Sequence, residues 1–346
     1  MKTAIIGDLH FGVRAASSEL HEYMGMFFAD LFAYVDEHRI KNLILTGDVF
    51  DSRKTINILV IEMFKDMFLS ETIKRDLSVF SVVGNHDIYY RETVAVNTLK
   101  TLLRDHQVLH PGQFTIIDEA KDVNIGGTTF FMVPWVCKDN HEAVAKAIKK
   151  SKAKYCVGHF EFDGFEMQRG QVMKTAHSHK AYSKFDTVFS GHYHSKSQRD
   201  NVLYVGTPYE LTWMDYGDEK GFWVFDDGDV TMVSNPHTLH SKIYYSDGFA
   251  PDKNDVHKKY VQLFIEQRIP KKELDSYLNV VHSMGPYDVK VKETYNDSLS
   301  ESTIVHTDMK DTTDMISEYV NDSDLTLDKQ RMIGIMHTLY RQAMLA

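Results

Sequence analysis

The chain has 346 residues, of which 43% are hydrophobic and 25% charged, and its formal net charge is −10 at pH 7. This is the composition of an ordinary soluble globular protein, and the acidic balance argues against an indiscriminate nucleic-acid binder. No apolar run approaches the roughly 20 residues that cross a membrane, and a strand-like segment follows the first three residues without a secretory signal. Its only two cysteines favour buried, reduced thiols over a disulfide. We therefore expect a cytoplasmic protein with no membrane contact.

The negative charge is unevenly spread. Residues 138–199 hold 12 Lys and Arg against 6 Asp and Glu, a local excess of six positive charges that leaves −16 for the rest of the chain. One interpretation is a solvated face with a lysine-rich helix. The other is a basic rim that guides a phosphate backbone toward a site.

The first 240 residues alternate short apolar runs with amphipathic patterns. Residues 4–7, 42–46 and 79–83 each predict a buried strand that ends in or just before a glycine. Apolar residues recur at three- and four-residue steps over about 18–38 and about 56–69, which predicts two helices. This alternation indicates an α/β architecture with loops gathered at the carboxyl ends of the strands.

The later strands are separated by turn signals more often than by helices. They are expected at residues 129–133, 154–157, 187–190, 202–205 and 221–225. Direct strand connections of this kind favour a two-sheet β-sandwich flanked by helices.

Beyond residue 240 we expect a small α+β cap and a helical extension. A strand, a helix and a strand are predicted at 260–266, 271–284 and 288–294, and two helices at 312–320 and 327–344. The expected parts are a catalytic domain over 1–240, a capping domain over 255–296 and a helical segment over 305–346.

Five short clusters of Asp, His and Asn follow apolar strands, and each begins with glycine. They are Gly7-Asp8-Leu9-His10, Gly47-Asp48-Val49-Phe50-Asp51, Gly84-Asn85-His86-Asp87, Gly158-His159 and Gly191-His192-Tyr193-His194. Glycine lets the backbone turn sharply off a strand and bring a side chain to a shared point. One such cluster is usually a turn or a cap, but five in series predict one site. Oxygen and imidazole ligands without a thiolate suit Mn²⁺, Fe or Zn²⁺ rather than a structural cysteine-rich zinc site.

The order of these clusters resembles the calcineurin-like metallophosphoesterase superfamily, whose pattern of D-x-H, G-D, G-N-H-[DE], G-H and G-H-x-H is matched in full. The resemblance implies two divalent metal ions bridged by Asp48. The remaining ligands would be Asp8, His10 and His194 for one ion, and Asn85, His159 and His192 for the other.

The resemblance also implies roles for the two residues that follow Asn85. His86 would face the phosphate and protonate or stabilise the leaving oxygen, and Asp87 would orient His86 through a hydrogen bond. Two cations about 3.5–4 Å apart clamp phosphate oxygens and bring the pKa of a shared water toward neutrality. A carboxylate is the fitting bridge, since a neutral ligand would leave the repulsion between two dications uncompensated.

Further stretches resemble nuclease subunits of the SbcCD type, and most closely the small subunits of recombination endonucleases of tailed bacteriophages. They are residues 47–54, 83–87, 133–135, 157–161, 190–194 and 204–209. The likeness covers about residues 1–240. It implies a DNA exonuclease and endonuclease for end processing, recombination and repair, working with Mn²⁺ or alternatively Mg²⁺, Fe or Zn²⁺.

The same resemblance implies partners and a location. They are DNA, an SbcC-like coiled-coil ABC-type ATPase and a second copy of the chain, within a two-plus-two complex in the cytoplasm (that of the host, if the chain is phage-encoded). Such nucleases bind the ATPase through C-terminal helices. The apolar stripe that includes Met332, Met336, Leu339 and Tyr340 is either that surface or a helix packed on its own domain.

One departure from the pattern concerns the residue three places after Asp48. Relatives in cellular organisms often carry histidine there, whereas this chain has Asp51. The metal set is intact, but the balance of exonuclease and endonuclease activity does not carry over. Arg53 and Lys54 either contact the phosphate backbone of DNA or form an exposed basic pair.

Two other functions compete with the nuclease. One is a small-molecule or protein phosphoesterase of the same superfamily, and the other is a scaffold that keeps the fold without the metals. The complete set of ligand types argues against the scaffold.

Overall fold

The computed structural model describes residues 1–168, 171–175, 177–246 and 250–294, together with residues 320, 329, 332 and 333. The chain forms two compact units, Met1–Tyr295 and Asn296–Ala346. Both helices expected after residue 305 fall almost wholly outside the described residues. Within the described part, no helix is both long enough and apolar enough to span a bilayer.

The first sheet has six strands in the order β14-β13-β1-β2-β3-β4, and its central pairs β1–β2, β2–β3 and β3–β4 are parallel. Its strands are β1 (Thr3–Ile6), β2 (Asn42–Leu45), β3 (Ser78–Val82), β4 (Phe114–Ile117), β13 (Gly221–Asp226) and β14 (Asp229–Ser234). Helices link the parallel strands, because such strands need crossover connections. Those helices are α1 (Ser18–Glu37), α2 (Ile58–Phe64), α3 (Ser70–Lys74), α4 (Thr98–Leu102) and α5 (Arg104–Leu109).

The second sheet also has six strands, in the order β11-β12-β10-β7-β6-β5, with antiparallel edges and a parallel centre. Its strands are β5 (Lys121–Ile125), β6 (Thr128–Val133), β7 (Tyr155–His159), β10 (Thr187–Gly191), β11 (Ser197–Arg199) and β12 (Val202–Tyr204). Helix α6 (His141–Lys150) connects β6 to β7, and a hairpin of β8 (Glu166–Gln168) and β9 (Gln171–Val172) follows β7.

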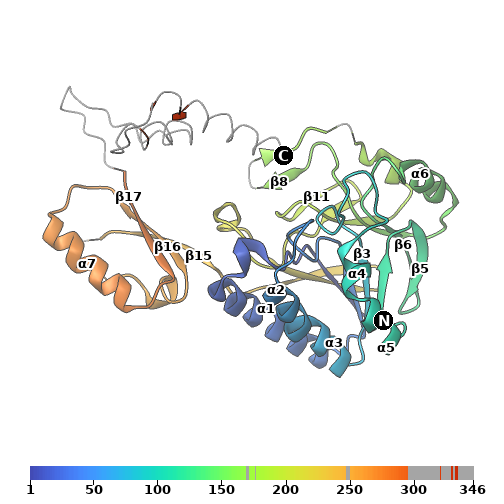
Figure 1. The fold of residues 1–346 in the computed structure, drawn as a ribbon, viewed down its shortest axis with the longest axis horizontal. Coiled ribbons are helices and arrows are strands. Elements are labelled where there is room, and N and C mark those ends of the chain that lie inside the picture. The colour runs from blue at the N-terminus through green and yellow to red at the C-terminus, as the bar shows by residue number, and fades with distance from the viewer. Residues whose placement is uncertain are drawn as a thin grey trace. The chain divides into compact units, whose positions relative to one another are not determined.

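The two sheets pack face to face around a shared apolar layer. Along β1, Ile5 points into this inner layer, whereas Ala4 and Ile6 point outward to the layer covered by α1 and α2. Figure 1 shows α1, α2 and α3 lying together. The alternation follows from the two-residue period of a strand, and burial on both faces explains why these strands read as continuous apolar runs. The predicted two-sheet α/β sandwich is confirmed.

A smaller sheet of three parallel strands follows. Its elements are β15 (His240–Tyr244), β16 (Tyr260–Ile265), β17 (Asp288–Glu293) and the helix α7 (Lys271–Ser283). Residues such as Ile243, Leu263 and Val281 form its own core. The strand–helix–strand pattern agrees with the sequence, but β15 was not predicted: it begins at the end of the expected catalytic domain (1–240) and lies before the expected cap (255–296).

Candidate metal centre

All five clusters lie where strands of the two sheets end. The residues Asp8, Asp48 and Asn85 follow β1, β2 and β3 of the first sheet, His159 ends β7 of the second, and His192 and His194 follow β10. Neighbouring parallel strands present their carboxyl ends at one edge, so loops from both sheets meet there.

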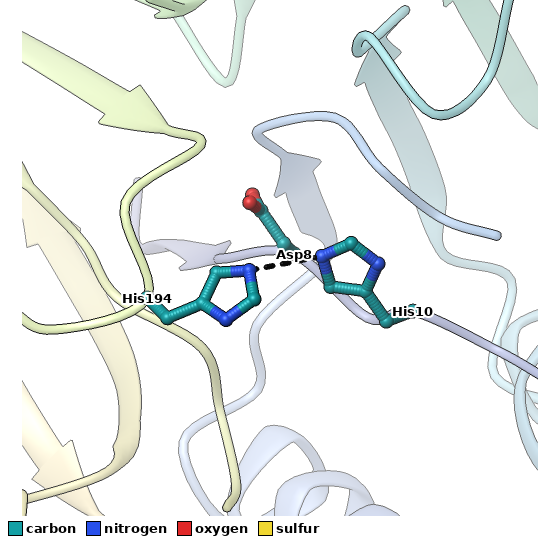
Figure 2. A group of neighbouring side chains, drawn as sticks. All are labelled: Asp8, His10 and His194. Carbon is teal, nitrogen blue, oxygen red and sulfur yellow. Dashed lines mark hydrogen bonds between the residues drawn. The ribbon is translucent and has the colours of Figure 1, made fainter. Parts of the chain in front are cut away.

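The first group of converging side chains contains Asp8, His10 and His194, whose ligand atoms all lie within 4.8 Å of one another. Figure 2 shows the two imidazoles pointing at each other beside the carboxylate, with 3.2 Å between His10 Nε2 and His194 Nε2. Asp8 also accepts a hydrogen bond from the main-chain N–H of His192 at 2.8 Å, which ties the first group to the loop after β10.

The second group contains Asp48, His159 and His192. His159 Nε2 lies 3.2 Å from Asp48 Oδ2. Asn85 Oδ1 lies between the two imidazoles, 2.8 Å from His159 Nε2 and 2.9 Å from His192 Nδ1. Asp48 therefore lies among the expected ligands of the second ion, and its bridging role stays a prediction.

These separations fit metal ligands. Ligands about 2.0–2.2 Å from one ion lie roughly 2.8–3.6 Å apart, from octahedral to tetrahedral geometry. The orientation of Asn85 also fits, because hydrogen bonding alone would favour the flipped amide. The flipped amide nitrogen would donate to both imidazoles and to Asp48, while its oxygen accepted from Arg53 Nη2. The unflipped amide instead directs the carbonyl oxygen, the atom that binds cations, at the centre of the group.

Three of the expected ligands have left-handed backbone conformations that non-glycine residues rarely adopt. The φ angles are 45° at His10, 46° at Asp48 and 88° at His192. Such conformations are costly and persist only where the surrounding fold enforces them, and they cluster at functional sites. No pattern in the sequence predicted these left-handed conformations.

The glycines serve mainly by lacking a side chain. Of the five that open the clusters, only Gly47 has a left-handed φ, at 109°. A Cβ on Gly84 would come within 2.2 Å of Asp48 Oδ1, and one on Gly191 within 2.3 Å of Asp8 Oδ1. The sharp-turn explanation is therefore wrong for Gly84 and Gly191, where the carboxylates need the space.

Buried charges strongly perturb one another in this cluster. Burial and the charge of Asp48 raise the pKa of Asp8 to about 6, against the opposing effect of His159. Burial alone would lower the pKa of His159, but Asp48 and Asp8 raise it to about 9. Burial and the charge of His159 lower the pKa of His192 to about 3. Burial and the charge of His10 likewise lower the pKa of His194 to about 3. Without a metal ion, these carboxylates and imidazoles therefore compete for protons. A bound cation would displace those protons.

The hydrogen bond predicted from Asp87 to His86 is wrong. The Asp87 carboxylate is buried and accepts from three main-chain N–H groups, those of Gly84, Val49 and Phe50. It therefore holds the loops after β2 and β3 together, and burial and Asp48 raise its pKa to about 7. His86 Nδ1 lies 2.5 Å from the main-chain oxygen of Asp51 instead.

Neighbouring groups also contact the outer nitrogens of two imidazoles and set the tautomer of one of them. His159 Nδ1 lies 2.8 Å from the main-chain oxygen of Thr46, so Nδ1 carries the proton and Nε2 is left for a metal. Buried His10 Nδ1 lies 3.3 Å from Asp51 Oδ1, an ion-pair contact rather than a well-aligned hydrogen bond. Asp51 thus contacts two histidines of the site, His10 through its side chain and His86 through its main chain. The sequence marked Asp51 only as a departure from the family pattern and did not predict these contacts.

Sequence reasoning also missed Lys220 and Tyr209. The buried ammonium of Lys220 donates to the main-chain oxygen of His194 at 2.9 Å and to Asp215 at 2.7 Å. The buried hydroxyl of Tyr209 donates to the main-chain oxygen of Leu9. Both hold loops that carry expected ligands. Lys220 stands in no recognised motif, and Tyr209 ends the nuclease-like stretch 204–209 without having been assigned a role from the sequence.

The residues suggested for DNA and partner contacts lie in different surroundings. Arg53 lines a cavity with His86, Ile88, Arg91 and Trp135, whereas Lys54 is solvent-exposed. Met332 is helical and half-buried, and Met336, Leu339 and Tyr340 lie outside the described residues.

Residues 1–196 match the sequence family described as Calcineurin-like phosphoesterase. The chain belongs to this family. Calcineurin-like phosphoesterases depend on divalent metal ions. Three groups of possible ligands converge among the described residues; the two made of expected ligands are where this member would hold the ions, and the third contains His10, Asp51 and His86.

Two curated relatives resemble the chain beyond the family domain. "Exonuclease subunit 1" of Enterobacteria phage T4 is 28% identical over 357 residues, covering 99% of each chain. "DNA double-strand break repair protein Mre11" of Nanoarchaeum equitans is 22% identical over 245 residues, covering 64% of this chain and 65% of that one. A solved archaeal phosphodiesterase is 13% identical, covers 68% of this chain and 100% of its own, and has a TM-score of 0.35, too low to support the fold.

Proposed function

We propose that this chain is a metal-dependent DNA nuclease and a subunit of a larger nuclease complex. The observation that carries the proposal is the convergence of two ligand groups beside His86 in a calcineurin-like phosphoesterase. The substrate follows from the relatives, since the phage protein that matches 99% of this chain is an exonuclease subunit and the archaeal relative is a repair protein for DNA double-strand breaks.

The proposed ligands divide between two ions with Asp48 as the bridge. One ion would be held by Asp8, His10 and His194, and the other by Asn85, His159 and His192. When bound, two such ions supply an activated water near neutral pH and positive charge for the phosphate oxygens. The oxygen and imidazole ligands suit Mn²⁺, with Mg²⁺, Fe or Zn²⁺ as alternatives.

His86 is the proposed acid for the leaving oxygen. Its Nδ1 donates to the main-chain oxygen of Asp51, so the ring is held in one orientation and Nε2 is free to carry the transferred proton. Its ring lies edge-on to His10, with 5.1 Å between ring centroids. Asp87 acts indirectly, by holding together the loops that follow β2 and β3.

The proposed assembly pairs two copies of this chain with two copies of an SbcC-like coiled-coil ATPase. Exposed apolar side chains on α2 and α5 support pairing of the chains: Ile58 and Val108 are both 77% exposed, and Leu109 is 73% exposed. For the ATPase we propose the segment 305–346. Co-purification with that ATPase should be lost when the chain is truncated after Asn296, and equal recovery would reject this docking segment.

A phosphoesterase acting on small molecules or phosphoproteins is the alternative from the same family. Purified protein should be assayed with Mn²⁺ on duplex DNA, a cyclic nucleotide and a phosphopeptide. The nuclease function predicts DNA hydrolysis that EDTA abolishes. Rapid phosphopeptide turnover with intact DNA would reject it.

A further inference from the structure

An aromatic cavity of about 200 Å³ lies directly beside the candidate metal centre. It shares His159 with the second ligand group and Trp135 with the cavity of Arg53 and His86. Its remaining lining is Val136, Phe160, Glu161, Phe162, His177, Ser178 and Tyr182. That volume is far more than the roughly 10–15 Å³ that a single water needs, and it leaves room for one planar heterocycle.

Aromatic residues make up much of its lining. The centroid of Tyr182 lies 4.7 Å from that of Phe160 and 5.3 Å from that of Phe162. Tyr182 is 6% exposed, and its hydroxyl makes no hydrogen bond with any residue that the structure describes. Exposed His177 and Ser178 form a polar rim. A flat ligand with polar edges suits this combination, because apolar faces meet the rings and an edge group partners the hydroxyl.

Trp135 lines both this cavity and a cationic one. Its ring centroid lies 5.8 Å from that of His159 and 5.2 Å from that of His192. Arg53 and Arg91 line the second cavity together with His86. Within the described part of the chain no carboxylate forms an ion pair with either guanidinium. An aromatic slot, an expected phosphodiester site and an unneutralised cationic cavity thus lie side by side.

We propose that the aromatic cavity takes one unstacked nucleobase, that of a nucleotide flanking the bond to be cut, with Trp135 as one wall. The arginine cavity takes a neighbouring phosphate of the same strand. This proposal rests on the proposed nuclease function and deepens it, because it makes an unpaired nucleotide part of the recognised substrate. Bases stack on aromatic side chains without regard to sequence, so the cavity selects unpaired structure rather than a sequence.

The test uses single-stranded oligonucleotides that carry one cleavable phosphodiester among phosphorothioates. The nucleotide on the 5′ or the 3′ side of that bond is either intact or an abasic tetrahydrofuran. For the full chain with Mn²⁺, the abasic change on one side should lower kcat/KM about tenfold or more, the value of one stacked base. The ratio of intact to abasic rates is the readout, so each variant is its own reference.

Three variants separate the cavity from the metal centre. Trp135→Ala should bring the ratio close to one, and Trp135→Phe should restore much of it. His177→Trp, which fills the cavity from its exposed rim without contacting a ligand, should also bring the ratio close to one. Trp213→Phe is the matched control, since Trp213 packs on His240 and lines neither cavity, and should keep the wild-type ratio.

The proposal would be overturned, and the nuclease function left standing, if the wild-type protein cleaved intact and abasic substrates equally well whichever side carried the abasic nucleotide. A wild-type ratio of intact to abasic rates in both Trp135→Ala and His177→Trp would overturn it as well. Hydrolysis of bis(p-nitrophenyl) phosphate with no cleavage of any oligonucleotide would instead overturn the nuclease function, and the base site with it.

Discussion

His86 and Asp51 are joined through the main chain: the imidazole Nδ1 lies 2.5 Å from the carbonyl oxygen of Asp51. The side chain of the same aspartate lies 3.3 Å from Nδ1 of His10. One residue therefore fixes the proposed acid through its backbone and an expected metal ligand through its carboxylate. The two functions are separable by mutation, because a side-chain substitution leaves the carbonyl oxygen in place.

Asp51→Ala should weaken Mn²⁺ binding while leaving His86 oriented. Neighbours that orient ligand imidazoles contribute about 10- to 100-fold to metal affinity, so we expect a loss of that size for the ion held by His10. Isothermal titration calorimetry on the metal-free protein measures it, and turnover at saturating Mn²⁺ should fall less than the affinity does. Unchanged affinity would show that the Asp51 carboxylate has no part in holding His10.

Replacing Asp48 and replacing His86 should produce opposite defects. Asp48→Ala removes the proposed bridge and should abolish stoichiometric Mn²⁺ binding, whereas His86→Ala should retain both ions and lose about 10²- to 10⁴-fold in turnover. Metal content after gel filtration and the rate on DNA distinguish them. A His86→Ala variant with near wild-type turnover would disprove the proposed acid.

The metal-free protein should release a proton when Mn²⁺ binds. Asp48 and Asp8 raise the pKa of His159 to about 9, above its usual 6.5. That proton stabilises the metal-free fold fully below about pH 6.5, and the contribution is lost as the pH rises through about 9. Because the ion must displace it, Mn²⁺ affinity should rise by up to about tenfold per pH unit across this window. Calorimetry in two buffers of different ionisation enthalpy counts the protons. Affinity that is independent of pH, with no proton released, would contradict the expected role of His159.

Lys220→Met should destabilise the fold. The side chains of Lys220 and Asp215 are each 3% exposed and form a direct ion pair, and removing one partner of a buried pair costs about 3–5 kcal/mol. Urea denaturation of the metal-free protein measures the loss. Adding Asp215→Asn should recover part of it, because the unpaired buried charge disappears. A single mutant as stable as wild type would show that the Lys220 ion pair and its bond to the His194 loop contribute little.

Local patterns predicted the strands that carry the site. The apolar runs before Asp8, Asp48 and Asn85 belong to central parallel strands buried on both faces, which leave a plain signal in sequence. Edge strands leave a weaker signal in the sequence. The edge strands β5 and β14 expose much of one face, and they were not predicted. The helix expected over 56–69 starts at Ile58 and continues through a π-helical turn, Lys65–Leu69, into α3.

For the site residues too, the sequence predicted some features and missed others. Each expected ligand has its donor atom or loop at the shared edge, but the supporting contacts depend on tertiary structure that a linear pattern does not encode. The Asp87 carboxylate is the clearest example. Its place after His86 suggested a side-chain partner, whereas folding brings three main-chain N–H groups to it from two loops.

The two ligand groups each draw residues from both sheets. Asp8 and His10 come from the first sheet and His194 from the second, and Asp48 faces His159 across the same junction. An ion bound in either group would therefore cross-link the two halves of the sandwich, as a disulfide cross-links distant parts of a chain. Metal supply would then govern the lifetime of the folded enzyme as well as its rate. A chain starved of metal would open first at this edge, where a protease reaches the catalytic loops before it reaches the core.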